Sequence, residues 1–481
     1  MQRGEPRSEH CKKGMPETSP AGTGDYDVAI IGGGVVGCAI ARAFTLEGAR
    51  VVLFEKAADV LDGASKGNSG ILHTGFDAPE DSLEQACIAA GHAEYLDICD
   101  RLNLPVIRCG ALVLAWTDDE AAILPGLMEQ ARRNRINDVE PLSAADILKL
   151  EPGLSRTVRA GFRVPREYLI DPWSAPHAYL RQATANGAIL MRDCEMIGGR
   201  FDGEIWRLAT SRMAIRAQFV INAAGLYGDL VDERLLGHRN FTITPRKGQF
   251  ILYDKPAAEL ASHILLPVPS KTTKGIVVCR TAFGNMLVGP TAEDQDDRHE
   301  ATLVPETLEA LARRGAEILP ALARQPVSAS YAGLRPATEF KDFQIRRHEG
   351  QNCITVGGIR STGLTAALGI ARYVFTLFAG GDRPFVPITE PIWPLMPAMS
   401  EAATRDWERA GNGGIICHCE RVTRREIESA LSASPAPQSF AGLKRHTRAT
   451  MGRCQGFYCS AAIAELAQGK LQHPMFQCHG R

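Results

Sequence analysis

Strand-length apolar runs alternate with helix-length periodic stretches along most of the chain. The first apolar run, residues 26–31, ends abruptly in a cluster of glycines. A helical pattern from Cys38 to Gly48 follows, and a second apolar run covers residues 51–55. Short apolar runs are typical of buried strands, and a glycine stop is typical of a helix end. This order predicts a β-strand, α-helix, β-strand unit.

The same alternation continues toward residue 380. Helical patterns lie at residues 83–102, 118–134, 144–150 and 359–380. Strand patterns lie at residues 111–115, 205–209, 217–225, 250–253, 275–279, 285–288 and 353–358. Strands that alternate with helices are typical of α/β folds. We therefore expect a Rossmann-like α/β nucleotide-binding domain that is interleaved with an α+β substrate domain.

Composition marks where the first domain ends. Residues 383–397 contain five prolines and no helical or strand periodicity, which is typical of a linker that wraps over a surface. The start of the chain is polar and rich in glycine, proline, serine and charge. The expected parts are a disordered leader, an interleaved domain, a linker, a small helical cysteine module and a tail, at residues 1–24, 25–397, 398–410, 411–470 and 471–481.

Charge and hydropathy exclude several classes of function. The chain has 481 residues and a formal net charge of −1, and 45% of its residues are hydrophobic. It therefore carries no long-range field for nucleic acid, and no basic run suggests a membrane-surface patch. No apolar stretch approaches the roughly 20 residues of a transmembrane helix. We expect a cytoplasmic protein, either free or peripheral to the inner membrane, with no nucleic acid among its partners.

Four of the 13 cysteines lie in two close pairs toward the end of the chain. One residue separates Cys417 from Cys419, and four separate Cys454 from Cys459. Thiolates that converge from two short loops bind a soft metal or an iron–sulfur cluster with little chain ordering. Structural zinc is one alternative, although zinc sites favour pairs spaced by two residues. Four unligated buried thiols are the other.

A glycine-rich turn follows the first predicted strand. Gly32, Gly34 and Gly37 have the G-x-G-x-x-G spacing, and Glu55 ends the second strand. Such glycines let a pyrophosphate approach the N-terminus of the next helix, where free N–H groups and the helix dipole favour an anion. A glutamate at the second strand end accepts hydrogen bonds from ribose hydroxyls. The pattern predicts a dinucleotide site; a glycine turn with a solvent-facing glutamate is the structural alternative.

Three further loops indicate which dinucleotide is bound. Residues 63–75, 222–225 and 357–364 are rich in small side chains, and together they resemble the flavin-binding loops of the FAD-dependent oxidoreductase superfamily that includes D-amino-acid oxidase. The resemblance covers residues 25–397 and implies FAD as the cofactor. It also implies which loop residues lie at the flavin: Ser65, Asn68, Ser69, Gly70, Ala224, Gly225, Gly358, Arg360, Gly363 and Leu364.

Other stretches are similar to FAD-linked glycerol-3-phosphate dehydrogenases, and several of them also to L-2-hydroxyglutarate oxidases. They lie at residues 67–75, 245–249, 263–269, 284–292 and 331–336. The resemblance implies a dehydrogenase that oxidises a small anionic secondary alcohol to the ketone. One departure weakens the case for glycerol 3-phosphate itself, because Ile359 stands where many of those dehydrogenases have lysine. A 2-hydroxy acid is the alternative substrate, and an amine or imino acid related to sarcosine, proline or an opine is another.

Residues 416–459 closely resemble the [2Fe–2S] domain of bacterioferritin-associated ferredoxin. The same module is appended to one of the subunits of anaerobic glycerol-3-phosphate dehydrogenases. The resemblance implies a [2Fe–2S] cluster on the four cysteines, through which electrons pass from FAD to a quinone or a partner protein. It also implies other dehydrogenase subunits as partners. A chain that relays electrons without a substrate of its own is the remaining alternative.

Oxidation of an alcohol by a flavin requires a base for the hydroxyl proton and a cation for the substrate's anion. His73 is the expected base, with a structural hydrogen bond or a covalent flavin bond as alternatives. Arg335 is the expected anion clamp, since a guanidinium offers two parallel donors; a surface arginine is the alternative. Lys247 and His263 are further candidates for substrate contact, or are structural. Arg360 is expected to bridge flavin and substrate, with an ion pair within the fold as its alternative.

Overall fold

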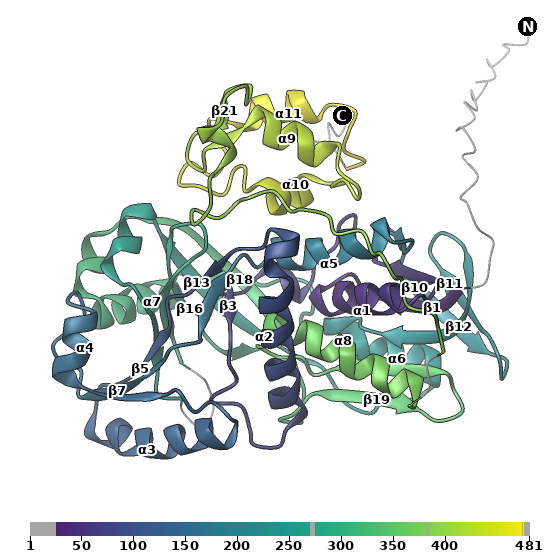
Figure 1. The fold of residues 1–481 in the computed structure, drawn as a ribbon. Coiled ribbons are helices and arrows are strands. Elements are labelled where there is room, and N and C mark those ends of the chain that lie inside the picture. Colours follow the sequence, from purple (N-terminus) through teal and green to yellow (C-terminus); the bar gives the residue numbers. More distant parts are fainter. Residues whose placement is uncertain (1–25, 270–274, 382–383, 474, 476–481) are drawn as a thin grey trace, which may run out of the picture.

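The computed structural model describes residues 26–269, 275–381, 384–473 and 475. Figure 1 shows two mixed α/β bodies side by side, with a small module above them. The predicted leader lies outside the described residues, as does most of the predicted tail. Among the described residues, no helix is long and apolar enough to cross a membrane.

The first body is built on an eight-stranded sheet with a parallel centre. There β1 (Tyr26–Ile31) lies between β2 (Val51–Phe54) and β12 (Ala214–Asn222). The other strands are β9 (Ile189–Met191), β10 (Met196–Phe201), β11 (Trp206–Thr210), β19 (Gln344–His348) and β20 (Cys353–Gly357). β9 and β20 extend the parallel part, and the rest pair antiparallel. The parallel strands are rich in buried valine, isoleucine and leucine because helices cover the sheet.

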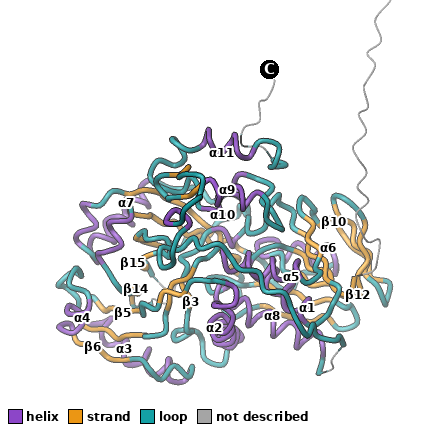
Figure 2. The backbone as a smooth tube through the Cα atoms, turned by 45° about the horizontal axis from the view of Figure 1, so that its top comes forward, coloured by secondary structure: helices purple, strands orange, loops and turns teal. Residues whose placement is uncertain are grey.

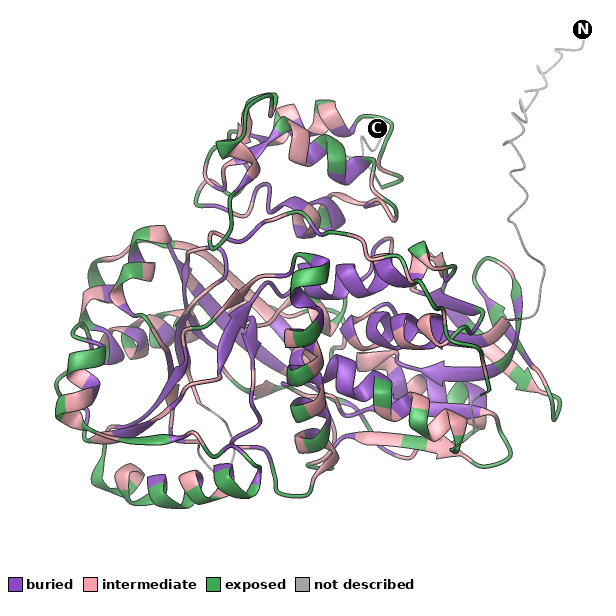
Figure 3. Cartoon of the chain, viewed as in Figure 1, coloured by how far each residue is buried: buried purple, intermediate pink, exposed green. Residues whose placement is uncertain are grey.

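The helices of this body cover both the sheet and one another. They are α1 (Val35–Leu46), α2 (Leu83–Leu102), α5 (Ser174–Ala185), α6 (Gly228–Leu236) and α8 (Gly363–Ala379). α1 packs against α5 and α8, and α8 packs against α2. Side chains of α1, α2, α5 and α8 join one face of the sheet in a large buried cluster, while α6 packs in a smaller cluster on the other face; Figure 3 shows this interior in purple. This core fixes the N-termini of α1 and α8 relative to the strand ends.

The second body is a nine-stranded sheet. Its two longest strands, β13 (Thr244–Tyr253) and β18 (Val327–Ala337), pair antiparallel, so that Arg246 lies beside Arg335. The other strands are β5 (Ala111–Ala115), β6 (Glu140–Ser143), β7 (Ala160–Val164), β14 (Ile264–Pro267), β15 (Val277–Arg280), β16 (Met286–Gly289) and β17 (Glu293–Asp294). The outer helices are α3 (Asp118–Arg133), α4 (Ala144–Leu150) and α7 (Pro305–Ile318).

A three-stranded antiparallel sheet lies at the junction between the two bodies. It consists of β3 (Ile71–Leu72), β8 (Tyr168–Ile170) and β4 (Val106–Ile107). β3 belongs to the small-residue loop, so this sheet holds that loop between the bodies. Single 3₁₀ turns complete the described structure at Ala64–Lys66, Gly225–Tyr227, Lys255–Leu260, Pro320–Arg324 and Asp406–Glu408.

The module consists of short elements joined by loops, as Figure 2 shows. They are β21 (Ile415–Cys417), β22 (Val422–Thr423), α9 (Arg424–Leu431), α10 (Phe440–Thr447) and α11 (Ser460–Ala467). Thr423 and Glu426 form a reciprocal capping box that starts α9. The helices enclose a small apolar core of their own, which includes Ile427, Leu443 and Ile463.

Buried polar contacts attach the module to the first body. Asp59, in the loop after β2, accepts hydrogen bonds from the N–H groups of Gln438 and Ser439 and from the Ser439 hydroxyl at 2.6–2.9 Å. Asp59 also pairs with Arg192 at 3.0 Å. Ser439 is the N-cap of α10, so the same contacts fix the start of that helix. The module is therefore held in a defined position by its α10 face.

The structure confirms most of the predicted elements, and α2 and β5 have the predicted bounds. The periodicity does not predict β18, α5 or α7, and it predicts only the end of β13. β18 is half-buried along most of its length and contains Gly333 and Arg335, so it has no strict alternation. The first half of β13 is not predicted for a similar reason, because it contains the polar residue Lys247. Other strands, such as β6, β7, β9 and β10, also lie outside the predicted runs, so the periodicity misses strands in both bodies and not only at the candidate site.

Candidate functional site

The glycine turn joins β1 to α1 at the carboxyl end of the sheet. Gly32 has a φ of +106°, and a Cβ there would lie 2.6 Å from a carbonyl oxygen just after β12. A Cβ on Gly37 would lie 1.9 Å from the Gly32 oxygen. Only glycine fits these positions, and Gly34 then caps α1. The N–H of Val35 donates to the Ser65 hydroxyl at 3.0 Å, so Ser65 lies at this helix N-terminus.

Glu55 ends β2 and turns back toward the glycine turn. Its Oε2 accepts from the Gly33 N–H at 2.8 Å, and its Oε1 accepts from the Ala57 N–H at 2.9 Å. Burial raises the pKa of Glu55, although these two hydrogen bonds oppose the shift. A buried carboxylate with lone pairs to spare suits hydroxyl donors. The turn and Glu55 therefore fit the pyrophosphate and ribose of a dinucleotide.

The small-residue loop, residues 63–75, docks on β18 of the second body. Asn68 accepts from the Gly70 N–H at 2.8 Å, and its carbonyl accepts from the Tyr331 hydroxyl at 2.8 Å. Gly67 and Gly333 meet so closely that a Cβ on either would lie 2.9–3.0 Å from the other's backbone. Small residues are therefore required where the loop meets β18. Gly333 is two positions from the predicted anion clamp, which brings that clamp close to the loop.

The N-terminus of α8 lies against the same loop. Gly363 and Leu364 open the helix, and the Thr365 hydroxyl accepts from the His73 N–H at 3.0 Å. The free N–H groups of a helix N-terminus stabilise oxygen atoms that carry partial negative charge. Ala224 and Gly225 follow β12 at the same edge of the sheet. The loops that the sequence assigns to FAD thus converge on one region.

Arg360 is engaged by the fold. It pairs with Glu84 at 3.2 Å and donates to the Lys341 carbonyl. Glu84 is buried and also accepts from the Thr362 hydroxyl at 2.8 Å. These contacts match the structural alternative, an ion pair within the fold. Contact of Arg360 or of Gly358 with the flavin stays a prediction.

His73 faces a buried glutamate that the sequence pattern does not reveal. Its Nδ1 lies 3.0 Å from Oε2 of Glu167, whose side chain is fully buried. The other carboxylate oxygen accepts from the N–H and the hydroxyl of Thr74 at 2.6 and 2.7 Å. As a carboxylate, Glu167 only accepts, so it places the proton on Nδ1 and leaves Nε2 as a base. No local signal marks Glu167, because only the tertiary fold brings it to His73.

Arg335 is a half-buried cation that forms no ion pair with the carboxylates the structure describes. Its guanidinium donates to the carbonyl oxygens of Thr291, Lys247 and Arg246 at 2.6, 3.2 and 3.3 Å, and in the described part of the chain no carboxylate lies within ion-pair distance. Burial, with Arg246 nearby, lowers the pKa of Arg335 to about 10, so it stays charged at neutral pH. A Cβ on Gly248 would lie 2.9 Å from its Nη2, so glycine makes room for it.

Lys247 and His263 both have carboxylate partners. Lys247 pairs with Glu293 at 3.2 Å, and Nδ1 of His263 lies 2.7 Å from Glu151. Glu151 also accepts from the backbone N–H of His263, which fixes the start of β14. These contacts are those of structural residues. Substrate contact by either residue stays a prediction, and Arg335 is the better-placed cation.

The four predicted ligand cysteines form two mixed pairs. The thiol of Cys419 lies within hydrogen-bonding reach of Cys454, and that of Cys459 within reach of Cys417. Each pair therefore takes one cysteine from each loop. Four thiols that approach one another from two short loops would hold a [2Fe–2S] cluster, as the sequence predicts.

The loop between Cys454 and Cys459 favours a thiolate and reaches the surface. N–H groups of Tyr458, Gly456 and Phe457 point at the Cys454 sulfur and, led by that of Tyr458, lower the pKa of Cys454. Phe457 and Tyr458 are 82% and 79% exposed. The predicted cluster thus lies beside an exposed aromatic pair.

A row of side chains connects the cluster loops with the small-residue loop. Glu420, which follows a predicted ligand, pairs with Arg448 at 2.8 Å. The guanidinium carbon of Arg448 lies 3.7 Å from the Phe283 ring centre, and Phe283 stacks on Trp173. The Trp173 indole N–H donates to the Lys66 carbonyl at 3.4 Å. These rings line a cavity of about 340 Å³ whose other wall is the small-residue loop.

Two family models match the chain. The first, FAD dependent oxidoreductase, covers residues 27–377, and the second, BFD-like [2Fe-2S] binding domain, covers residues 415–468. They confirm the predicted resemblances and the predicted cofactors, FAD and a [2Fe–2S] cluster. The residues at the dinucleotide turn and the two cysteine pairs fit these groups.

Relatives and solved structures agree with the family models. A glycerol 3-phosphate dehydrogenase of Caloramator mitchellensis is 33% identical over 93% of this chain and 94% of its own length. A glycerol 3-phosphate oxidase of Mycoplasma pneumoniae is 31% identical over 72% of this chain and 92% of its own length. The dithionite-reduced L-alpha-glycerophosphate oxidase from Mycoplasma pneumoniae with FAD bound superimposes with a TM-score of 0.71 and 28% identity, over 77% of this chain and 97% of that one. The chain therefore belongs to the FAD dependent oxidoreductase family, and a BFD-like [2Fe–2S] binding domain follows the family's fold.

Proposed function

We propose that this FAD-dependent oxidoreductase, of the glycerol-3-phosphate dehydrogenase type, oxidises glycerol 3-phosphate to the ketone and sends the electrons through the cluster to a quinone or a partner protein. The observation that carries the substrate class is Arg335, a half-buried guanidinium with three carbonyl partners and no counter-ion within the described residues. A cation that is largely withdrawn from water beside the flavin loop, with no counter-ion in the described part of the chain, favours an anionic ligand. The phosphate of the substrate supplies that anion.

Oxidation of the secondary alcohol removes the carbon-bound hydrogen as a hydride and the hydroxyl hydrogen as a proton. Bound FAD supplies the hydride acceptor, and the bound cluster supplies a one-electron relay. The proton goes to Nε2 of His73, because Glu167 keeps the other ring nitrogen protonated. Glu167 also stabilises the imidazolium that forms. Thr74 in turn orients Glu167 through two short hydrogen bonds.

Electrons leave at the face of the module where Phe457 and Tyr458 are exposed. Exposed aromatic pairs are typical anchors of protein interfaces. Because this pair lies between two predicted cluster ligands, an acceptor that docks on it would be close to the cluster. We therefore assign this face to the electron acceptor, be it a quinone-reducing protein or another partner.

Anaerobic bleaching of the flavin absorbance against a substrate panel tests the proposal. The panel contains glycerol 3-phosphate, L-2-hydroxyglutarate, sarcosine and proline, with unphosphorylated glycerol as the matched control. We expect rapid bleaching by glycerol 3-phosphate and little by glycerol, since glycerol lacks the anion that Arg335 binds. Faster bleaching by a hydroxy acid or an amine would contradict the substrate assignment. No bleaching by any panel member would favour a chain that only relays electrons.

A further inference from the structure

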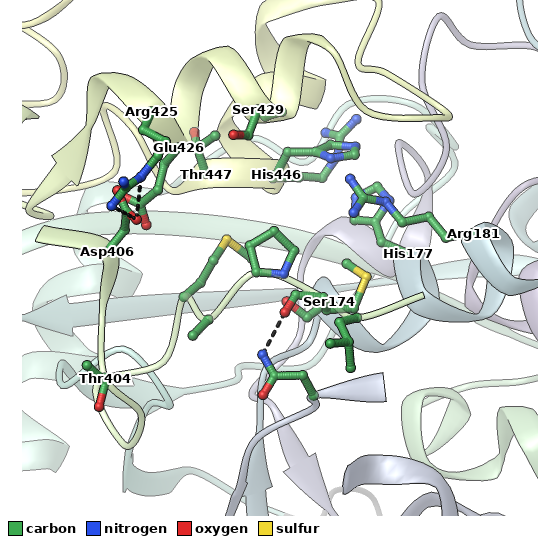
Figure 4. Close-up of a pocket in the computed structure, with 18 of the residues that line it drawn as sticks. Ser174, His177, Arg181, Thr404, Asp406, Arg425, Glu426, Ser429, His446 and Thr447 are labelled. Atoms are coloured by element: carbon green, nitrogen blue, oxygen red, sulfur yellow. Dashed lines mark hydrogen bonds and ion pairs between the residues drawn. The ribbon is translucent and has the colours of Figure 1, made fainter. Parts of the chain in front are cut away.

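A second cavity lies between the first body and the module. Its volume is about 540 Å³, and Figure 4 shows the side chains around it. It is bounded by α5, by residues 395–409 and by α9 and α10. None of the described residues assigned above to FAD, to the substrate or to the cluster lines it. The cavity is therefore a separate space, and it has the size of a small-molecule site.

One end of this cavity is cationic. His177 and Arg181 come from α5, and Arg445 and His446 come from α10. The ring centres of the two histidines lie 4.0 Å apart. Figure 4 shows His177, Arg181 and His446 turned toward one another. Arg445 reaches Asp62 at 3.4 Å, whereas Arg181 has no carboxylate within ion-pair distance in the ranges that the structure describes.

Three buried nitrogens at the cationic end have no hydrogen-bond partner within the described residues. They are Nε2 of His177, Nε of Arg181 and Nε of Arg445. The His177 residue is only 3% exposed. Burial, together with the nearby His446 and Arg181, lowers the pKa of His177 well below its usual value. Buried polar atoms are rarely left unpaired, so these nitrogens point to a missing acceptor.

The carboxylates of the cavity do not neutralise this end. Asp406 pairs with Arg425 at 2.7 Å, and Glu426 accepts from the Thr423 N–H at 2.8 Å. Figure 4 shows Asp406, Arg425 and Glu426 grouped apart from the histidines. The third lining carboxylate, Asp100, comes from the end of α2, and no ion pair joins it to Arg181 among the described residues. The positive charge of Arg181 is therefore available to a ligand.

We infer that this cavity binds a small anionic molecule, whose phosphate or carboxylate group is held by Arg181 and Arg445 with His177 and His446. A guanidinium favours both kinds of oxyanion, and the unpaired imidazole nitrogen supplies a further polar contact. Because two of the four side chains come from α5 and two from α10, the ligand bridges the flavin-binding body and the cluster module. Its binding thus stabilises the docked position of the module.

Isothermal titration calorimetry of the holoprotein tests the site, with inorganic phosphate and citrate as separate probes. Arg181→Gln is the test variant, because among the described residues this guanidinium has no ion pair to break. Arg132→Gln, at an exposed arginine of α3, is the matched control. Loss of one charge-assisted contact should weaken binding by about 10–10²-fold in Arg181→Gln and leave the control unchanged. If only phosphate binds, the natural ligand is a phosphate ester, and if only citrate binds, it is a polycarboxylate. If both bind, the site selects only for negative charge.

The proposed substrate site is a second place for an anion, so Arg335→Met is titrated in parallel. Binding that disappears in Arg335→Met but persists in Arg181→Gln would put the anion at the substrate site and overturn the inference. Absence of binding to the wild type at millimolar probe would overturn it as well. If Arg181→Gln loses flavin, His446→Gln replaces it as the test variant. Unchanged affinity in His446→Gln would then refute the site.

Discussion

Glutamine at position 167 keeps the size of the side chain but changes how His73 is oriented. Oε1 of Glu167 accepts two hydrogen bonds from Thr74, while Oε2 lies 3.0 Å from Nδ1 of His73. A glutamine amide has one oxygen, which the two Thr74 donors retain, so its NH₂ group faces Nδ1. Nδ1 must then accept, and the ring proton moves to Nε2. The imidazole in this tautomer cannot take the substrate's hydroxyl proton.

The expected cost is that of losing the general base, about 10²–10⁴-fold in the rate of flavin reduction. This corresponds to about 2.7–5.4 kcal/mol of transition-state stabilisation. Thr74→Val is the matched control, because it removes one hydroxyl donor to Oε1 but leaves the contact between Glu167 and Nδ1 intact. Its cost should be that of a single hydrogen bond, about tenfold.

Anaerobic stopped-flow reduction of the flavin by glycerol 3-phosphate measures the chemical step directly. Both variants are compared with wild type at equal flavin content, so that a loss of cofactor does not enter the rate. A Glu167→Gln rate as high as that of Thr74→Val would refute the role of Glu167 in setting the His73 tautomer. A normal rate in both variants would also remove His73 as the base.

Three further changes have defined outcomes. Arg335→Lys keeps the charge but loses the two-pronged geometry, so the KM for glycerol 3-phosphate should rise about 10–10²-fold in steady-state assays; an unchanged KM would contradict the anion clamp. Serine at both Phe457 and Tyr458 should slow turnover with the natural acceptor about tenfold and leave flavin reduction by substrate unchanged, whereas slower flavin reduction would argue for a structural role. Burial lowers the pKa of His446 to about 3, from 6.5 in the unfolded chain, so His446 contributes stability above pH 6.5 that is lost as pH falls toward 3. Urea unfolding should show a loss of up to about 1.4 kcal/mol per pH unit below pH 6.5, smaller in His446→Asn; equal losses in both would contradict this.

What the sequence could predict depends on whether the signal is local. The turn at Gly32 and the acid at Glu55 are predictable because strand, turn and helix follow one another in the chain. The cysteine loops are predictable for the same reason. Arg335 could be proposed from a resemblance, but its lack of a counter-ion among the described residues is a property of β13, β17 and β18 packed together.

Contacts between distant segments could not be predicted. Glu167 lies 94 positions from His73, and only the junction sheet brings the two side chains together. Likewise, Glu151 and Glu293 become recognisable as the carboxylate partners of His263 and Lys247 only once the second body is folded. The half-buried pattern of β18 hides it from periodicity, because both of its faces are partly covered.

The central claim is that electrons from glycerol 3-phosphate enter the flavin and continue to the cluster. Anaerobic addition of glycerol 3-phosphate to the purified holoprotein, followed by optical and electron paramagnetic resonance spectroscopy, tests it most directly. We predict that the flavin bleaches and that the signal of a reduced [2Fe–2S] cluster appears. In Cys454→Ser the flavin should still bleach without that signal. An oxidised cluster beside a fully reduced flavin in the wild type would contradict the account.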